Sequence, residues 1–161
     1  MNLAIAIFVL SFPFGRQAPA PHPPSPAKQE PLTATEKGQL GRETGLDGRV
    51  RVYESANTRL GREVQGEIQQ GNVEPITLRL EAWTDLLEMS LKDIETNANR
   101  KRKSRAVIQY EIQIRKWIAD MHGLALKAPS ECQKQFEDWL GSAERVRKRL
   151  VDILFQREGS E

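Results

Sequence analysis

Hydrophobic residues recur at helical spacing along most of the chain. From Leu46 to Ile68 they are three, four or seven residues apart, which places them on one stripe of an amphipathic helix. Similar stripes cover residues 75–94, 104–124 and 130–154, and the three tryptophans of the chain fall on them. The one short alternating run, RVRVY at residues 49–53, lies inside the first stripe. The pattern therefore predicts four amphipathic helices in an all-α fold, with the tryptophans in its core.

The breaks between the stripes are short and carry residues that end or begin helices. Gly71 and Pro75 separate the first two stripes, and Pro129 ends the third. Ser130 followed by Gln133 is the pattern of a capping box at the start of the last helix. Because short connections favour consecutive helices packed in opposite directions, we expect an antiparallel up-down-up-down four-helix bundle.

Four glycines precede the first stripe, at positions 38, 41, 45 and 48. On a helix, steps of three, four and three residues would place them on one face and permit close backbone approach. Charged neighbours such as Lys37 and Asp47 argue against a membrane helix here. Since each glycine costs a helix up to about 1 kcal/mol relative to alanine, we expect this helix to be frayed or broken.

The N-terminal end of the chain differs in composition from the rest. Residues 2–14 are almost wholly apolar, too short a run for a membrane-spanning helix of about 20 residues but typical of the apolar core of a secretory signal. Ala18-Pro19-Ala20 has the small residues that a signal peptidase reads, whereas a positively charged n-region is missing and Pro21 would hinder cleavage. We expect an exported protein, periplasmic or extracellular, or one tethered to a membrane by residues 2–14.

Proline then dominates the sequence up to Pro31. Seven of the nine prolines fall between Pro13 and Pro31, a run that favours an extended spacer. The expected organisation is a signal peptide or membrane tether over residues 1–20, a Pro-rich linker over residues 21–32, and a helical bundle domain over residues 33–161.

The charge balance and the reactive residues limit the chemistry. Net charge is only +2, from 24 Lys and Arg against 22 Asp and Glu, which makes nucleic acid an unlikely partner because a dedicated binder needs a surplus of cations. The single cysteine, Cys132, excludes an intramolecular disulfide and is expected to be a half-buried structural residue. Neither His22 nor His122 has Glu three or four residues before it, so no metal or haem site is predicted. Phosphate-loop and nucleophile-elbow motifs are also missing. We therefore expect a protein without cofactor or catalysis.

Two cationic runs are the main functional candidates: RKRKSR at residues 100–105 and RVRKR at residues 145–149. In an up-down-up-down bundle, the junction of the second and third helices lies at the same end as the C-terminus of the fourth. We call the cations of these two runs the basic pole and expect them to contact an anionic partner through charge density. They are Arg100, Lys101, Arg102, Lys103, Arg105, Arg145, Arg147, Lys148 and Arg149.

A solvated helix connection is the competing interpretation of the basic pole. Lysine and arginine suit the last turn of a helix, and Glu95, Glu144 and Asp152 are placed to neutralise them in part. On balance the sequence predicts a non-catalytic interaction or structural protein. Its partner would be a protein or an anionic membrane surface, and a homo-oligomer is left open. A cytoplasmic nucleic-acid-associated module and an enzyme without a linear motif are the alternatives.

Overall fold

The computed structural model describes residues 28–98 and 104–155, and every regular element in these ranges is helical. The elements are α1 (Ala34–Arg42), α2 (Leu46–Gln70), α3 (Val73–Asn97), α4 (Arg105–Ala125), the 3₁₀ turn η1 (Ser130–Cys132) and α5 (Gln133–Phe155). The predicted all-α fold is confirmed for these residues. The signal peptide or tether expected over residues 1–20, residues 21–27 of the linker, and Arg100 to Lys103 lie outside the described residues.

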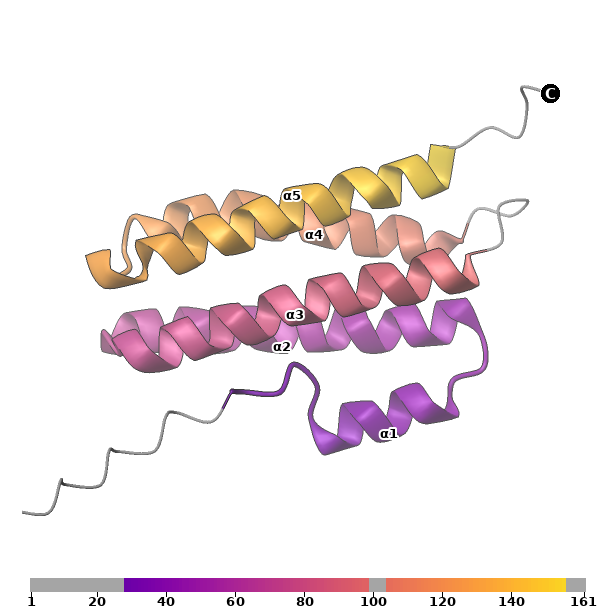
Figure 1. The fold of residues 1–161 in the computed structure, drawn as a ribbon, viewed down its shortest axis with the longest axis horizontal. Coiled ribbons are helices and arrows are strands. Elements are labelled where there is room, and N and C mark those ends of the chain that lie inside the picture. Colours follow the sequence, from indigo (N-terminus) through magenta and orange to yellow (C-terminus); the bar gives the residue numbers. More distant parts are fainter. Residues whose placement is uncertain (1–27, 99–103, 156–161) are drawn as a thin grey trace, which may run out of the picture.

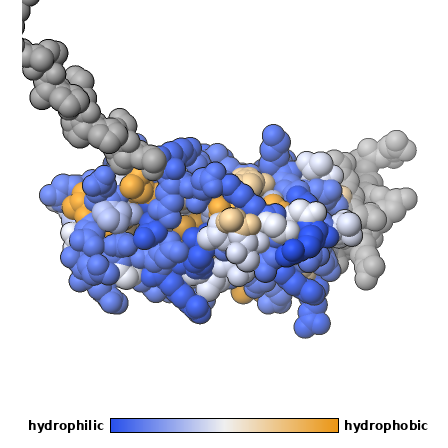
Figure 2. All heavy atoms as spheres, turned by 90° about the horizontal axis from the view of Figure 1, so that it is seen from below, coloured by the Kyte–Doolittle hydropathy of each residue, from blue (hydrophilic) through white to orange (hydrophobic). Residues whose placement is uncertain are grey.

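The four long helices enclose one core. α2 packs against both α3 and α4, and α5 packs against the same two helices, so these contacts close a ring in the order α2, α3, α5, α4. In Figure 1, α3 and α5 lie in front of α2 and α4, and α1 lies below α2, away from α4 and α5. Seen from below, the surface is mostly hydrophilic with scattered apolar patches (Figure 2).

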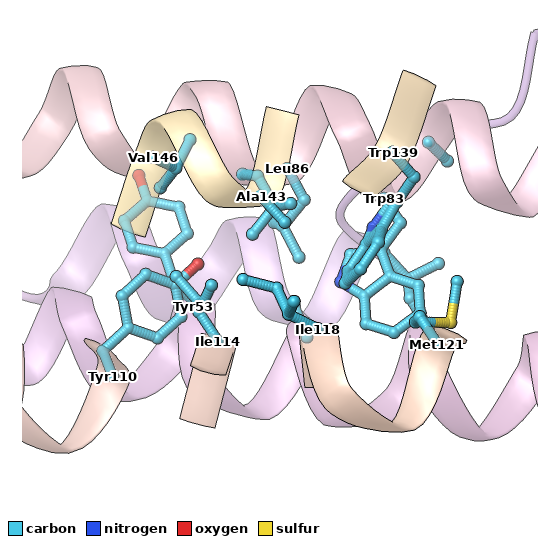
Figure 3. Packing of buried hydrophobic residues seen from close by; sticks show 14 of the residues in the cluster. Tyr53, Trp83, Leu86, Tyr110, Ile114, Ile118, Met121, Trp139, Ala143 and Val146 are labelled. Carbon is cyan, nitrogen blue, oxygen red and sulfur yellow. The ribbon is translucent and has the colours of Figure 1, made fainter. Parts of the chain in front are cut away.

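Aromatic side chains fill much of the core. The ring of Trp83 in α3 meets Trp117 of α4 edge to face at 5.1 Å between centroids, and it meets Trp139 of α5 at 4.5 Å. Trp83 and Trp139 are fully buried, whereas Trp117 is half-buried. Figure 3 shows Trp83 and Trp139 against each other, with Tyr53 and Tyr110 in another part of the core. The expected core placement of the tryptophans is confirmed, with Trp117 at its edge.

Hydrogen bonds between buried polar groups link three of the helices. The indole N–H of Trp83 donates to the side-chain oxygen of Asn57, and the amide of Asn57 donates to Gln113 Oε1 at 2.9 Å. Gln113 in turn donates to Thr58 Oγ1 at 2.8 Å. Asn57 and Trp83 are completely buried. Because buried polar groups are costly unless paired, this chain fixes α2, α3 and α4 in one register.

The glycine-rich stretch forms two helices separated by a break. Thr33 caps α1 in a reciprocal capping box with Glu36, whose carboxylate also binds Arg59 of α2 at 2.8 Å. α1 ends at Arg42 and α2 begins after Gly45, so the helix is broken inside the glycine series, as expected. A tertiary ion pair and a local cap thus stabilise α1 on the surface of α2.

The boundaries of the other helices mostly agree with the sequence pattern. Gly71 ends α2 with φ +72°, the left-handed conformation in which glycine is favoured, and Pro75 lies in the first turn of α3. The predicted capping box of Ser130 and Gln133 is wrong. The Ser130 hydroxyl donates to Glu131 at 3.1 Å, and the Gln133 amide donates to the Ala125 carbonyl at 2.8 Å. Gln133 binds a carbonyl that the end of α4 leaves unpaired, which competes with capping its own helix.

Candidate functional site

The cations of α5 lie beside acidic residues of α3. Arg145 donates to Glu88 Oε1 at 3.0 Å, and Arg149 donates to Glu95 Oε1 at 2.8 Å. These side chains are largely exposed, with 64% of Arg145 and 51% of Arg149 accessible. Exposed ion pairs of this kind contribute about 0–1 kcal/mol each, so their main effect is to lower the net positive charge of the surface.

Arg147 points instead to α4. It donates to Glu111 Oε1 at 3.0 Å, and Glu144 lies 3.7 Å away in the next turn of α5. The Glu111 side chain is only 11% exposed, which makes this the most enclosed ion pair of the basic pole within residues 28–98 and 104–155. Lys148 and Arg105 are exposed, and neither has an ion pair with another described residue.

The structure brings the described part of the basic pole toward one end of the molecule. The Arg149 to Glu95 contact places the second half of α5 beside the last turns of α3. Ser104 donates to Asp47 Oδ1 at 2.6 Å, which places the start of α4 beside the start of α2. In Figure 1 the end of α3, the start of α4 and the end of α5 share this side. Arg105, Lys148 and Arg149 are therefore at the same end.

Glu95, Glu144 and Asp152, which the sequence suggested as neutralising groups, all contact basic residues. Glu95 and Asp152 flank Arg149, the latter at 3.9 Å, and Glu144 lies by Arg147. The contacts of Glu88 and Glu111 with α5 were not predicted from the sequence. These residues lie on α3 and α4, and only the arrangement of the helices places them beside α5.

Charge is distributed unevenly between the described residues and the rest of the chain. Six of the 24 Lys and Arg and two of the 22 Asp and Glu lie outside the described residues, which leaves 18 cations against 20 anions in the described part. Four of the six outside cations are Arg100 to Lys103, between α3 and α4. Residues 100–103 are therefore the densest run of positive charge in the sequence, and the described cations Arg105 and Lys148 add to it at the end of the bundle where α3 ends.

Other candidate chemistry finds little support among the described residues. Cys132 is completely buried rather than half-buried, and burial raises the pKa of its thiol. Residues 28–98 and 104–155 contain no group of three or more His, Cys, Asp or Glu side chains that could hold a metal ion. In the same residues, no helix has both the length and the apolar character needed to cross a membrane.

Comparison of the chain with protein-family models, with curated proteins and with solved structures found no match.

Proposed function

We propose that this is a non-catalytic helical interaction protein, exported or membrane-tethered, whose basic pole binds an anionic membrane surface. The main support for this proposal is the position of exposed cations that have no ion pair with a described residue. Arg105 and Lys148 are exposed at the end of the molecule where α3 ends, and the sequence adds four consecutive cations between Asn99 and Ser104. Each Lys or Arg near an anionic bilayer contributes about 1 kcal/mol, so a cluster of this size is sufficient for measurable binding.

The proposal includes an arrangement of the long helices in which successive helices run in opposite directions. Contacts between α2 and α3 support this, since Arg49 near the start of α2 binds Asp93 near the end of α3 at 2.8 Å. Contacts between α2 and α4 advance in the same direction along both helices, from Asp47 with Ser104 to Asn57 with Gln113.

One feature differs from the simplest up-down-up-down bundle. The ring of contacts places α3 beside α5, so α3 and α4 lie diagonally opposite although they are consecutive in the sequence. The connection over residues 98–104 therefore joins two diagonal corners of the ring. The four consecutive cations of residues 100–103 belong to this connection in the sequence, and we propose that they face the anionic surface.

Vesicle sedimentation of the full chain tests the proposal. Phosphatidylcholine vesicles that contain phosphatidylserine should pellet the protein at low salt, and changing Arg100, Lys101, Arg102 and Lys103 to Ala should abolish most of this binding. The matched control removes the same charge from exposed sites elsewhere: Arg115, Lys116, Lys127 and Lys134 to Ala. We expect the control to retain most of the binding. Equal loss in both variants, or binding that is insensitive to salt, contradicts a localised basic pole.

A fractionation experiment tests the location separately. The full-length chain should be found outside the cytoplasm or with the membrane fraction, and N-terminal sequencing of the mature protein shows whether residues 1–20 are removed. A cytoplasmic protein that binds DNA or RNA with steep salt dependence, and that ignores vesicles, favours the nucleic-acid-associated alternative instead.

A further inference from the structure

A polar groove separate from the basic pole lies between α2 and α4. Its volume is about 410 Å³, and most of its lining comes from the outward face of α2, with Gln113 contributed by α4. The α2 residues that matter here are Arg51, Ser55, Thr58 and Arg62, which recur at steps of four, three and four and so share one helix face.

Two arginines stand at opposite ends of this groove. Arg51 and Arg62 are both exposed, and neither forms an ion pair with another described residue. Eleven residues of helix separate their Cα atoms by about 16 Å, so their long side chains can converge on the space between them. Arg59 also borders the groove, but Glu36 and Glu63 already bind its guanidinium. The unpaired positive charge of the groove thus comes from Arg51 and Arg62.

Neutral hydrogen-bonding groups lie between the two arginines. Thr58 Oγ1 donates to the carbonyl of Glu54 at 3.0 Å and accepts from Gln113 Nε2 at 2.8 Å. Asn57 donates a hydrogen bond to the Oε1 atom of Gln113 and accepts one from the Trp83 indole, so the floor of the groove is connected to the buried hydrogen bonds around Trp83. The Ser55 hydroxyl is exposed and has no hydrogen bond to another described residue. The floor is therefore fixed in place, while one hydroxyl and two guanidinium groups remain available.

These groups suit a tetrahedral oxyanion. Guanidinium groups bind phosphate oxygens through paired, charge-assisted hydrogen bonds, and serine hydroxyls donate to the remaining oxygens. Glu54 is the only carboxylate of the lining, against three arginines, which leaves the groove cationic although the described residues as a whole carry more acids than bases. We propose that the groove between α2 and α4 binds a phosphate monoester group, carried either by a small soluble molecule or by a lipid headgroup.

Titration of the full chain with inorganic phosphate, followed by NMR of the arginine side-chain Nε–H signals, tests the soluble form. We expect the signals of Arg51 and Arg62 to shift and saturate together. Changing either to Gln should weaken the apparent affinity roughly tenfold, since each removes charge-assisted hydrogen bonds. Arg115→Gln is the matched control, because Arg115 is exposed on α4 and has no ion pair with a described residue. Circular dichroism verifies that each variant keeps its helices.

The lipid arm uses the chain in which Arg100, Lys101, Arg102 and Lys103 are changed to Ala, so that the basic pole cannot account for binding. Phosphatidylcholine vesicles with phosphatidic acid should still pellet this chain, and adding Arg51→Gln and Arg62→Gln should abolish the pelleting, if the natural group is a headgroup. Binding of inorganic phosphate without vesicle binding assigns the groove to soluble phosphates. If neither probe binds, or if Arg115→Gln weakens binding as much as Arg51→Gln, the proposed site is wrong, whatever the outcome for the basic pole.

Discussion

Gly61 of α2 lies directly against the indole ring of Trp117 in α4. A Cβ atom added at this position would be 2.4 Å from Cη2 and 2.5 Å from Cζ2 of that ring. Carbon atoms in contact prefer about 3.5–4.0 Å, so Gly61→Ala forces the ring to retreat by more than about 1 Å. A shift of this size disturbs the edge-to-face contact of the ring with Trp83, which is fully buried 5.1 Å away, centroid to centroid.

Two opposing effects decide whether Gly61→Ala raises or lowers the free energy of unfolding. Alanine in place of glycine favours a helix by about 1 kcal/mol. Against this, overpacking costs about 1–3 kcal/mol, and loss of the edge-to-face contact with Trp83 costs about 0.5–1.5 kcal/mol. We therefore expect Gly61→Ala to lower the free energy of unfolding by about 1–2 kcal/mol, since clash and lost contact together exceed the gain in helix propensity.

Gly66 provides a control within the same helix. A Cβ atom at Gly66 would meet nothing within 4 Å, so Gly66→Ala should raise the free energy of unfolding by roughly 0.5–1 kcal/mol. Urea denaturation followed by circular dichroism measures both variants, and tryptophan fluorescence reports on the ring cluster. Trp117→Leu should remove most of the difference between the two alanine variants. If Gly61→Ala is as stable as Gly66→Ala in the parent chain, the close packing of Gly61 against Trp117 is refuted.

Three further outcomes are expected. Burial by itself raises the pKa of Glu36, but hydrogen bonds from Arg59 and the Thr33 backbone outweigh it and hold the pKa below the ordinary value of a glutamate. The stability that this carboxylate contributes is present above its unfolded pKa and is lost as pH falls through its folded pKa. Glu36→Gln should therefore flatten the stability profile measured by urea denaturation between roughly pH 6 and pH 3. Asn57→Leu should cost about 1–3 kcal/mol in the same assay, because it leaves the buried indole N–H of Trp83 unpaired, and unchanged stability would contradict this. Cys132 should react with a thiol reagent only when denaturant unfolds the chain, since it is fully buried and burial raises its pKa; rapid reaction in native buffer contradicts the placement.

Hydrophobic spacing predicted the long helices and most of their buried faces. Val50, Leu60, Leu80 and Ile114 all lie on predicted stripes and are at most 1% exposed. This works because the helical period alone determines which side chains share a face. Leu91, Leu140 and Ile153, at the edges of the stripes, are only half-buried.

Interactions between different helices could not be predicted from the spacing of hydrophobic residues. Spacing along one helix does not say which helix becomes its neighbour, so neither the contact of α3 with α5 nor the pairing of Glu111 with Arg147 was predicted. Asn57 gave no signal either, because an isolated polar residue on a stripe does not identify its partner. In contrast, the capping box of Thr33 and Glu36 has the ordinary Thr-x-x-Glu pattern, and it could have indicated α1 from the sequence.

The cations of the described residues fall into two groups: those that form ion pairs with carboxylates of the same chain, and exposed ones that are available to bind an external anion. Each arginine of the 145–149 run already has a carboxylate from a neighbouring helix, so binding an outside anion there would exchange one carboxylate for another anion with little net gain. Other exposed cations have no ion pair with a described residue, so they can bind an outside anion without giving up a carboxylate partner. They include Arg51 and Arg62 in the groove and Arg105 and Lys148 at the end of the bundle. Net charge near zero for the whole chain is therefore compatible with anion binding, because some exposed cations have no ion pair with a described residue although the charges balance overall.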